Sequence, residues 1–159
     1  MNVRPIAFVV IGLLAVLSCK MIDIRKPAES FLHMKDDTNT LTYDQKKEIE
    51  NQIIQVEKNK AIEMLLLIIY STGELDEIEY ANKCIDEYSL GKSNGRGLVV
   101  VIAKADRVIR IQYTEEVLPD FSENDAKQII DTYFIPHFKN ERFYEGICEG
   151  ILAIGMTLR

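Results

Sequence analysis

Residues 94–146 place an apolar hairpin, an acidic loop and a capped helix one after another, and this order restricts the fold more than any other part of the chain. The run 98–103 has no polar residue, residues 104–106 provide a turn, and the returning segment has Ile109 and Ile111 two positions apart. A continuous apolar run joined to an alternating run by a short polar turn predicts a β-hairpin.

The segments before this hairpin alternate between helix and strand patterns. Thr42 and Gln45 form a capping box that predicts a helix to about residue 58. Residues 62–70 are too continuously apolar for a strand with one wet face, so we expect a central strand covered on both faces. A second helix is expected over residues 74–90, with one apolar face made of Ile78, Ala81, Ile85 and Tyr88.

Two further helices are expected over residues 122–135 and 143–158. The order strand, helix, strand favours a right-handed crossover between parallel strands, and the hairpin adds an antiparallel edge. We therefore predict an α/β fold, a three-layer α/β/α sandwich with a small mixed β-sheet.

The first nineteen residues predict export. Arg4 is their only charge, and the apolar run 6–17 is shorter than the roughly 20 residues that a membrane-spanning helix needs. The run ends at Val16-Leu17-Ser18-Cys19, which resembles a bacterial lipobox. We expect a signal peptide over 1–18, lipid on Cys19, a tether over 19–35 and one domain over 36–159. Ordinary cleavage nearby and an uncleaved anchor are the alternatives.

The charge of the chain excludes a nucleic-acid binder. The sequence has 19 basic and 25 acidic residues, and removal of the leader takes away Arg4, so the net charge goes from −6 to −7. We expect the protein in the bacterial cell envelope, facing the periplasm or the exterior, anchored to the membrane through Cys19 and bound to an envelope protein partner.

Two motifs carry little functional weight. Residues 91–93, Gly-Lys-Ser, look like the end of a phosphate-binding loop, but Asp86 stands where the leading glycine is needed and the triplet follows a predicted helix. Cys84 and Cys148 each lie beside apolar residues in predicted helices, which favours packing over nucleophilic catalysis. A disulfide between them stays open.

The acidic loop after the hairpin is the main candidate site. Glu115, Glu116 and Asp120 lie between a strand end and a helix beginning near Ser122. Carboxylate oxygens in such a loop suit Ca²⁺ or Mg²⁺. The alternative is that these carboxylates only favour the positive end of the helix. Lys92, Asn94 and Arg96 are expected close to this loop.

The order of hairpin, acidic loop and capped helix, followed by Phe138-Lys139 and Tyr144-Glu145-Gly146, resembles the TPM-domain family over roughly residues 35–157. The resemblance implies the same α/β/α fold and a metal site in which Glu115 matches the family's Glu and Asp120 its Asp. Asp36 matches an Asp ahead of the first helix and is a secondary metal candidate. By strand polarity we expect Asp36 at the opposite end of the sheet from Asp120.

This chain departs from the family where a Gly-Tyr-Gly segment precedes the Glu. It has Gln112-Tyr113-Thr114 and is about two residues shorter. Glycine lets a backbone approach an ion or a phosphate closely, so its loss weakens the expectation of catalysis.

Two functions follow from these residues. The favoured one is a lipid-anchored envelope TPM-domain protein that acts as a noncatalytic binding module with divalent-metal binding, in the assembly or repair role that the resemblance implies. The alternative, which the resemblance implies, is a metal-assisted phosphomonoester hydrolase. There Glu115 and Asp120 would hold the cation, and Arg96 or Lys92 would stabilise developing charge. The residues leave open whether the protein is an enzyme.

Overall fold

A computed structural model describes residues 31–159 of the chain. Its centre is a four-stranded sheet in the order β1-β2-β3-β4. The strands are β1 (Met34–Asp36), β2 (Glu63–Ile69), β3 (Gly97–Ala103) and β4 (Val108–Tyr113). The first three run parallel, and β4 runs antiparallel to β3. The predicted mixed sheet and its antiparallel edge are confirmed.

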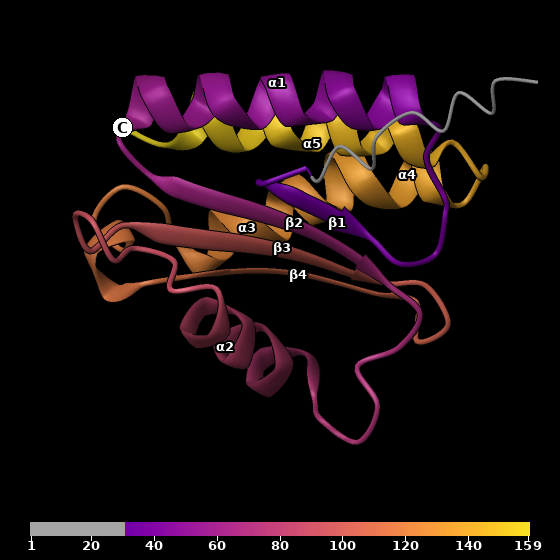
Figure 1. The fold of residues 1–159 in the computed structure, drawn as a ribbon, viewed down its shortest axis with the longest axis horizontal. Coiled ribbons are helices and arrows are strands. Elements are labelled where there is room, and N and C mark those ends of the chain that lie inside the picture. Colours follow the sequence, from indigo (N-terminus) through magenta and orange to yellow (C-terminus); the bar gives the residue numbers. More distant parts are fainter. Residues whose placement is uncertain (1–30) are drawn as a thin grey trace, which may run out of the picture.

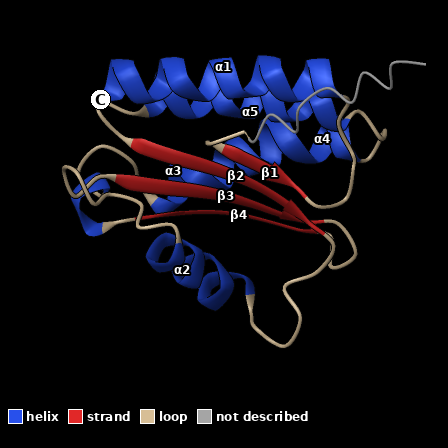
Figure 2. Cartoon of the chain, in the orientation of Figure 1, coloured by secondary structure: helices blue, strands red, loops and turns tan. Residues whose placement is uncertain are grey.

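Helices cover both faces of this sheet (Figures 1 and 2). One face packs against α1 (Tyr43–Lys60), α3 (Glu123–Ile129), α4 (Ile135–Phe138) and α5 (Phe143–Thr157). The other face packs against α2 (Glu77–Glu87). The molecule is therefore the α/β/α sandwich that the sequence predicts.

Burial on both faces of the sheet explains why the sequences of β2 and β3 are almost entirely apolar. Leu66 of β2 and Val100 of β3 are register partners, and both side chains are fully buried among α1, α3 and α5. Their neighbours Leu67 and Val101 point the other way and are buried against α2. Successive side chains of a strand point to opposite faces, so a strand covered twice must be apolar throughout.

The sequence predicts the start of α1 correctly but places the start of α2 too early. The Thr42 hydroxyl and the Gln45 side chain form the predicted capping box of α1. The second helix begins at Glu77, later than predicted, because Asp76 caps it by accepting from two backbone N–H groups. Its buried face is centred on Ala81 and Cys84.

The apolar face predicted for α2 was therefore partly wrong. Ile78 and Tyr88 are 44% and 41% exposed, while Ile85 is partly buried. Ala81 and Cys84, in the middle of the helix, pack on the sheet, whereas Ile78 lies in its first turn and Tyr88 is its C-cap.

The predicted single helix over 122–135 is interrupted. A π-helical turn, η2 (Ile130–Phe134), separates α3 from α4, and Pro136 lies in the first turn of α4. Proline lacks the N–H that an inner helical turn needs, which favours a break before it. The Phe134 ring lies so close to Gly150 of α5 that a Cβ there would be 2.1 Å from the ring.

Several predictions concern residues that the structure does not describe. The signal peptide, Cys19 and most of the tether lie before residue 31. Within residues 31–159 no helix combines the length and the apolar character needed to cross a bilayer. Cys84 and Cys148 are both free thiols and lie in α2 and α5, on opposite faces of the sheet.

Candidate functional site

The candidate site lies where β3 begins and β4 ends. Because these strands are antiparallel, the glycine loop (residues 91–97) before β3 meets the acidic loop (residues 114–120) after β4. The Thr114 N–H donates to the Gly97 carbonyl across 3.0 Å and extends the ladder by one pair. The two predicted parts of the site, one on each loop, are thus brought together.

Arg96 connects the two loops by an ion pair. Its Nη1 donates to Asp120 Oδ2 across 2.7 Å and to the Glu116 carbonyl oxygen across 3.2 Å. The two side chains are only 19% and 25% exposed, so the pair is partly shielded from solvent. The second terminal nitrogen of Arg96, Nη2, is buried without a hydrogen-bond partner among the described residues.

Thr114 closes the glycine loop through its hydroxyl group. Its hydroxyl donates to the Gly95 carbonyl across 2.6 Å and accepts from the Gly97 N–H across 2.9 Å. Gly95 has a φ of +82°, and a Cβ there would lie 2.8 Å from Glu116 Cγ. The Thr114 side chain therefore links two residues of the glycine loop to the end of β4.

Glu63, at the start of β2, holds the other side of the glycine loop. Its carboxylate accepts from the backbone N–H groups of Gly91, Lys92 and Ser93 at 2.6, 3.1 and 3.2 Å. The Ser93 side chain and these N–H groups lower the pKa of Glu63. The Gly-Lys-Ser triplet thus follows a helix, as predicted, and its N–H groups already bind a carboxylate of the same chain.

The metal ligands predicted in the acidic loop lie on a short 3₁₀ helix and just after it. Glu115 and Glu116 are exposed residues of a short 3₁₀ helix, η1 (Glu115–Val117). The Asp120 carboxylate and the Glu116 carbonyl are both engaged by Arg96. Within residues 31–159 no three His, Cys, Asp or Glu side chains are arranged to hold a metal ion. The arrangement does not fit a preformed divalent-cation site, because a guanidinium supplies the positive charge.

Asp36 lies at the opposite end of the sheet, as strand polarity predicts. It pairs with Ile68 near the end of β2, and its carboxylate accepts from the backbone N–H groups of Thr38, Thr40 and Leu41. Lys46 lies 3.1 Å away, and the Asp36 side chain has no exposed surface. Burial acts to raise the pKa of Asp36, but these hydrogen bonds outweigh it and leave the pKa lowered. These contacts make Asp36 an organiser of the β1–α1 connection.

The sequence analysis missed a cluster around His33. The two ring nitrogens of His33 lie 2.9 Å from Glu50 and 3.1 Å from Glu57, both on α1. Burial raises the pKa of Glu57. The sequence shows that Glu50 and Glu57 share one face of the helix, because they are seven residues apart. Only the position of β1 brings His33 to that face.

One family model and several solved structures are similar to this chain. A family model described as TPM domain matches residues 34–157. No curated protein matches the chain significantly.

Three solved structures share the fold. The N-terminal domain of a P. gingivalis protein aligns with a TM-score of 0.72 at 22% identity, covering 79% of this chain and 80% of that one. The BA42 protein of Bizionia argentinensis aligns at 0.65 with 22% identity, covering 77% and 84%. The N-terminal domain of a Corynebacterium glutamicum protein aligns at 0.63 with 12% identity, covering 80% of each.

Proposed function

The chain belongs to the TPM-domain family, and from this premise we propose that it is a lipid-anchored, noncatalytic binding module of the bacterial cell envelope. The anchor is proposed from the sequence Leu17-Ser18-Cys19 after an apolar leader. The module is the α/β/α sandwich itself, which begins with β1 only a short way along the chain from that cysteine.

The noncatalytic proposal rests on the Arg96–Asp120 ion pair. A metal-assisted hydrolase needs carboxylate and carbonyl oxygens that are free to coordinate a cation. Here the Asp120 carboxylate and the Glu116 carbonyl accept hydrogen bonds from one nitrogen of Arg96. A divalent ion would have to displace a partly buried guanidinium before it could bind both oxygens.

A phosphomonoester hydrolase is the second candidate, and one observation favours it. Arg96 Nη2 is buried and has no hydrogen-bond partner in the described part of the chain. A free guanidinium donor beside a carboxylate is a group that could stabilise an oxyanion. Arg96 and Asp120 would then be the catalytic residues.

An assay of p-nitrophenyl phosphate hydrolysis separates the two candidates. The full-length chain would be assayed with Mg²⁺ and with Ca²⁺, beside the variants Asp120→Asn and Arg96→Gln. The proposal expects the wild-type rate to equal that of both variants, at the level of contaminating activity. Turnover that both variants abolish, while a surface variant such as Lys139→Gln keeps it, would establish the hydrolase instead.

A further inference from the structure

The edge of β4 offers unpaired backbone groups. The sheet order places β4 at one edge, next to β3 alone. Since Thr114 and Gly97 form a hydrogen-bonded pair, the antiparallel alternation turns the N–H and C=O groups of Ile109, Ile111 and Tyr113 away from β3. In residues 31–159 no other segment pairs with them. Such an edge is a template for an added strand.

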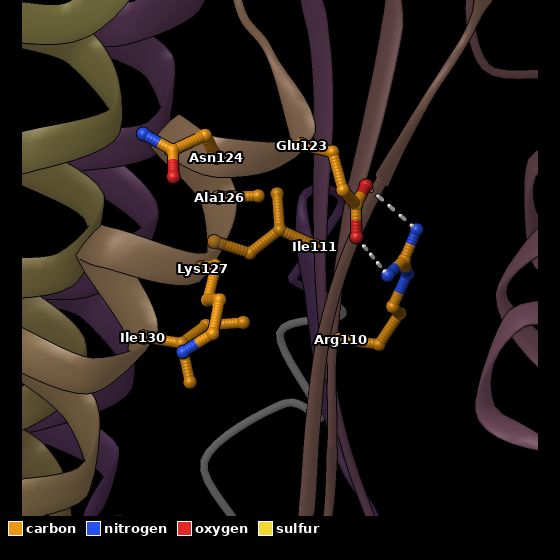
Figure 3. A pocket seen from close by; sticks show the side chains of 7 residues that line it. All are labelled: Arg110, Ile111, Glu123, Asn124, Ala126, Lys127 and Ile130. Carbon is orange, nitrogen blue, oxygen red and sulfur yellow. Dashed lines mark hydrogen bonds and ion pairs between the residues drawn. The ribbon is translucent and has the colours of Figure 1, made fainter.

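A hollow of about 400 Å³ lies beside this edge, between β4 and α3 (Figure 3). Its apolar lining comes from Ile111 of β4, Ala126 of α3 and Ile130 just after α3. Asn124 and Lys127 stand at its polar side. The hollow is on the face of the sheet that Ile111 shares with α1 and α5. An apolar side chain from an added strand would enter it there.

An ion pair crosses the same edge. Arg110 lies on the α2 face, because it alternates with Ile111, whereas Glu123 begins α3 on the other face. Two hydrogen bonds of 2.6 and 3.1 Å join the guanidinium to the Glu123 carboxylate (Figure 3). β3 occupies one edge of β4, so the Arg110 and Glu123 side chains reach each other past the other, unpaired edge of β4.

This ion pair is asymmetric in its exposure. The Arg110 side chain is 16% exposed and the Glu123 side chain 64%. The Glu123 carboxylate is mostly exposed, so the carboxylate of a bound partner can compete with it for the guanidinium. The guanidinium also donates to the Gln112 side chain at 3.0 and 2.6 Å, which holds it in place when Glu123 swings away. Its charge, which is partly buried, then favours a new anion.

We propose that this edge binds an extended peptide strand that carries an acidic residue next to a large apolar one. The peptide backbone pairs with the outward groups of Ile109, Ile111 and Tyr113. Neighbouring side chains of a strand point to opposite faces, so the carboxylate meets Arg110 on the α2 face while the apolar side chain enters the hollow. The inference rests on the proposed binding function and names the chemistry of the partner.

A library of linear heptapeptides displayed on phage, selected on the full-length chain, tests this proposal. The selected consensus is expected to place Asp or Glu directly beside Leu, Ile, Val or Phe. The best peptide is then synthesised, its dissociation constant is measured by calorimetry, and its position is mapped by backbone amide shifts. The shifts are expected at residues 109–113 and along α3.

Two substitutions are expected to change the affinity for the peptide in opposite directions, which a merely structural role of the ion pair would not produce. Arg110→Gln removes the anchor and is expected to weaken binding about tenfold, the loss of one charge-assisted contact. Glu123→Gln removes the internal competitor and is expected to tighten it. Arg107→Gln, in the turn of the same hairpin, and Glu141→Gln, an exposed residue just before α5, are the matched controls and leave binding unchanged.

Four results would overturn the proposal: no selected peptide, a consensus without acidic residues, shifts centred on β1 or on α1 and α5, or weaker binding by Glu123→Gln. A concentration-dependent dimer with shifts along β4 would make the occupant a second copy of the chain and would also overturn it. Hydrolysis of p-nitrophenyl phosphate bears on the noncatalytic proposal alone, so the two failures are distinguishable.

Discussion

Arg96 Nη1 lies 2.7 Å from Asp120 Oδ2 and 3.2 Å from the Glu116 carbonyl oxygen, so one nitrogen joins the start of β3 to the turn after β4. The same two loops are joined again by the Thr114 hydroxyl, which contacts Gly95 and Gly97. Two separate sets of hydrogen bonds therefore join the loops at this end of the strand pair.

Thr114→Val is expected to destabilise the domain by about 1–3 kcal/mol, because the buried Gly97 N–H loses its acceptor and the Gly95 carbonyl its donor. Valine keeps the shape of the side chain, so packing hardly changes. Thr114→Ser keeps the hydroxyl and is expected to cost much less. Urea unfolding measures both variants, and a loss in Thr114→Val no larger than that in Thr114→Ser would contradict the role given to the hydroxyl.

Leu66→Ala is expected to lower the free energy of unfolding by about 2–5 kcal/mol, because it opens a cavity at a fully buried position. Leu152, which is 58% exposed on α5, provides the control. Leu152→Ala is expected to change stability by less than about 0.5 kcal/mol. Thermal and urea melts measure both, and a cost at Leu66 as small as at Leu152 would contradict the burial of Leu66 between the sheet and its helices.

These elements differ in how far the sequence predicts them. The capping box of Thr42 and Gln45 and the hairpin 98–113 depend on residues close in the chain, so their patterns are sufficient. The Arg96–Asp120 pair depends on where the 3₁₀ turn after β4 places Asp120, and no local pattern encodes that position. The sequence therefore predicts that Arg96 is near the acidic loop without predicting the bond.

The missed features share this dependence on distant contacts. His33 meets Glu50 and Glu57 only because β1 runs alongside β2 and under α1. The π-helical turn after Ile129 includes Phe134, whose ring packs on Gly150 of α5, a residue 16 positions further along the chain. Periodicity describes one segment at a time and does not contain such pairs.

Asp36→Asn is expected to destabilise the domain at neutral pH by about 1–3 kcal/mol, because the carboxylate satisfies three backbone N–H groups and pairs with Lys46. The pKa of Asp36 is lowered in the folded state, so the unfolded state binds the proton more tightly. The stability that Asp36 contributes is therefore present above its unfolded pKa of about 3.9 and is lost as the pH falls through the folded pKa.

The measurement is urea unfolding of both proteins between neutral and acid pH. The difference between them is expected to stay constant down to about pH 5 and to shrink below about pH 4, where the wild-type carboxylate takes up its proton. A difference that does not depend on pH would show that the charge of Asp36 contributes nothing.

Cys19→Ser is expected to release the protein from the membrane fraction or to leave it with an uncleaved leader, because lipid attachment needs the thiol. Mass spectrometry of the wild-type membrane fraction is expected to show a chain that begins at a lipidated Cys19. Cys84→Ser, on a cysteine buried in the domain, is the control for handling and expression. A wild-type chain that keeps residues 1–18 and carries no lipid would replace the lipoprotein proposal with a simple anchor.

Titration of the full-length chain with Ca²⁺ and Mg²⁺, followed by thermal melting, tests the central claim most directly. A cation that binds only the folded state raises the melting temperature by mass action. Because Arg96 already holds the oxygens of Asp120 and Glu116, we predict no rise for the wild type at millimolar concentrations and a rise for Arg96→Gln, which frees them. A rise in the wild type that Asp120→Asn abolishes would contradict the account and restore the acidic loop as a metal site.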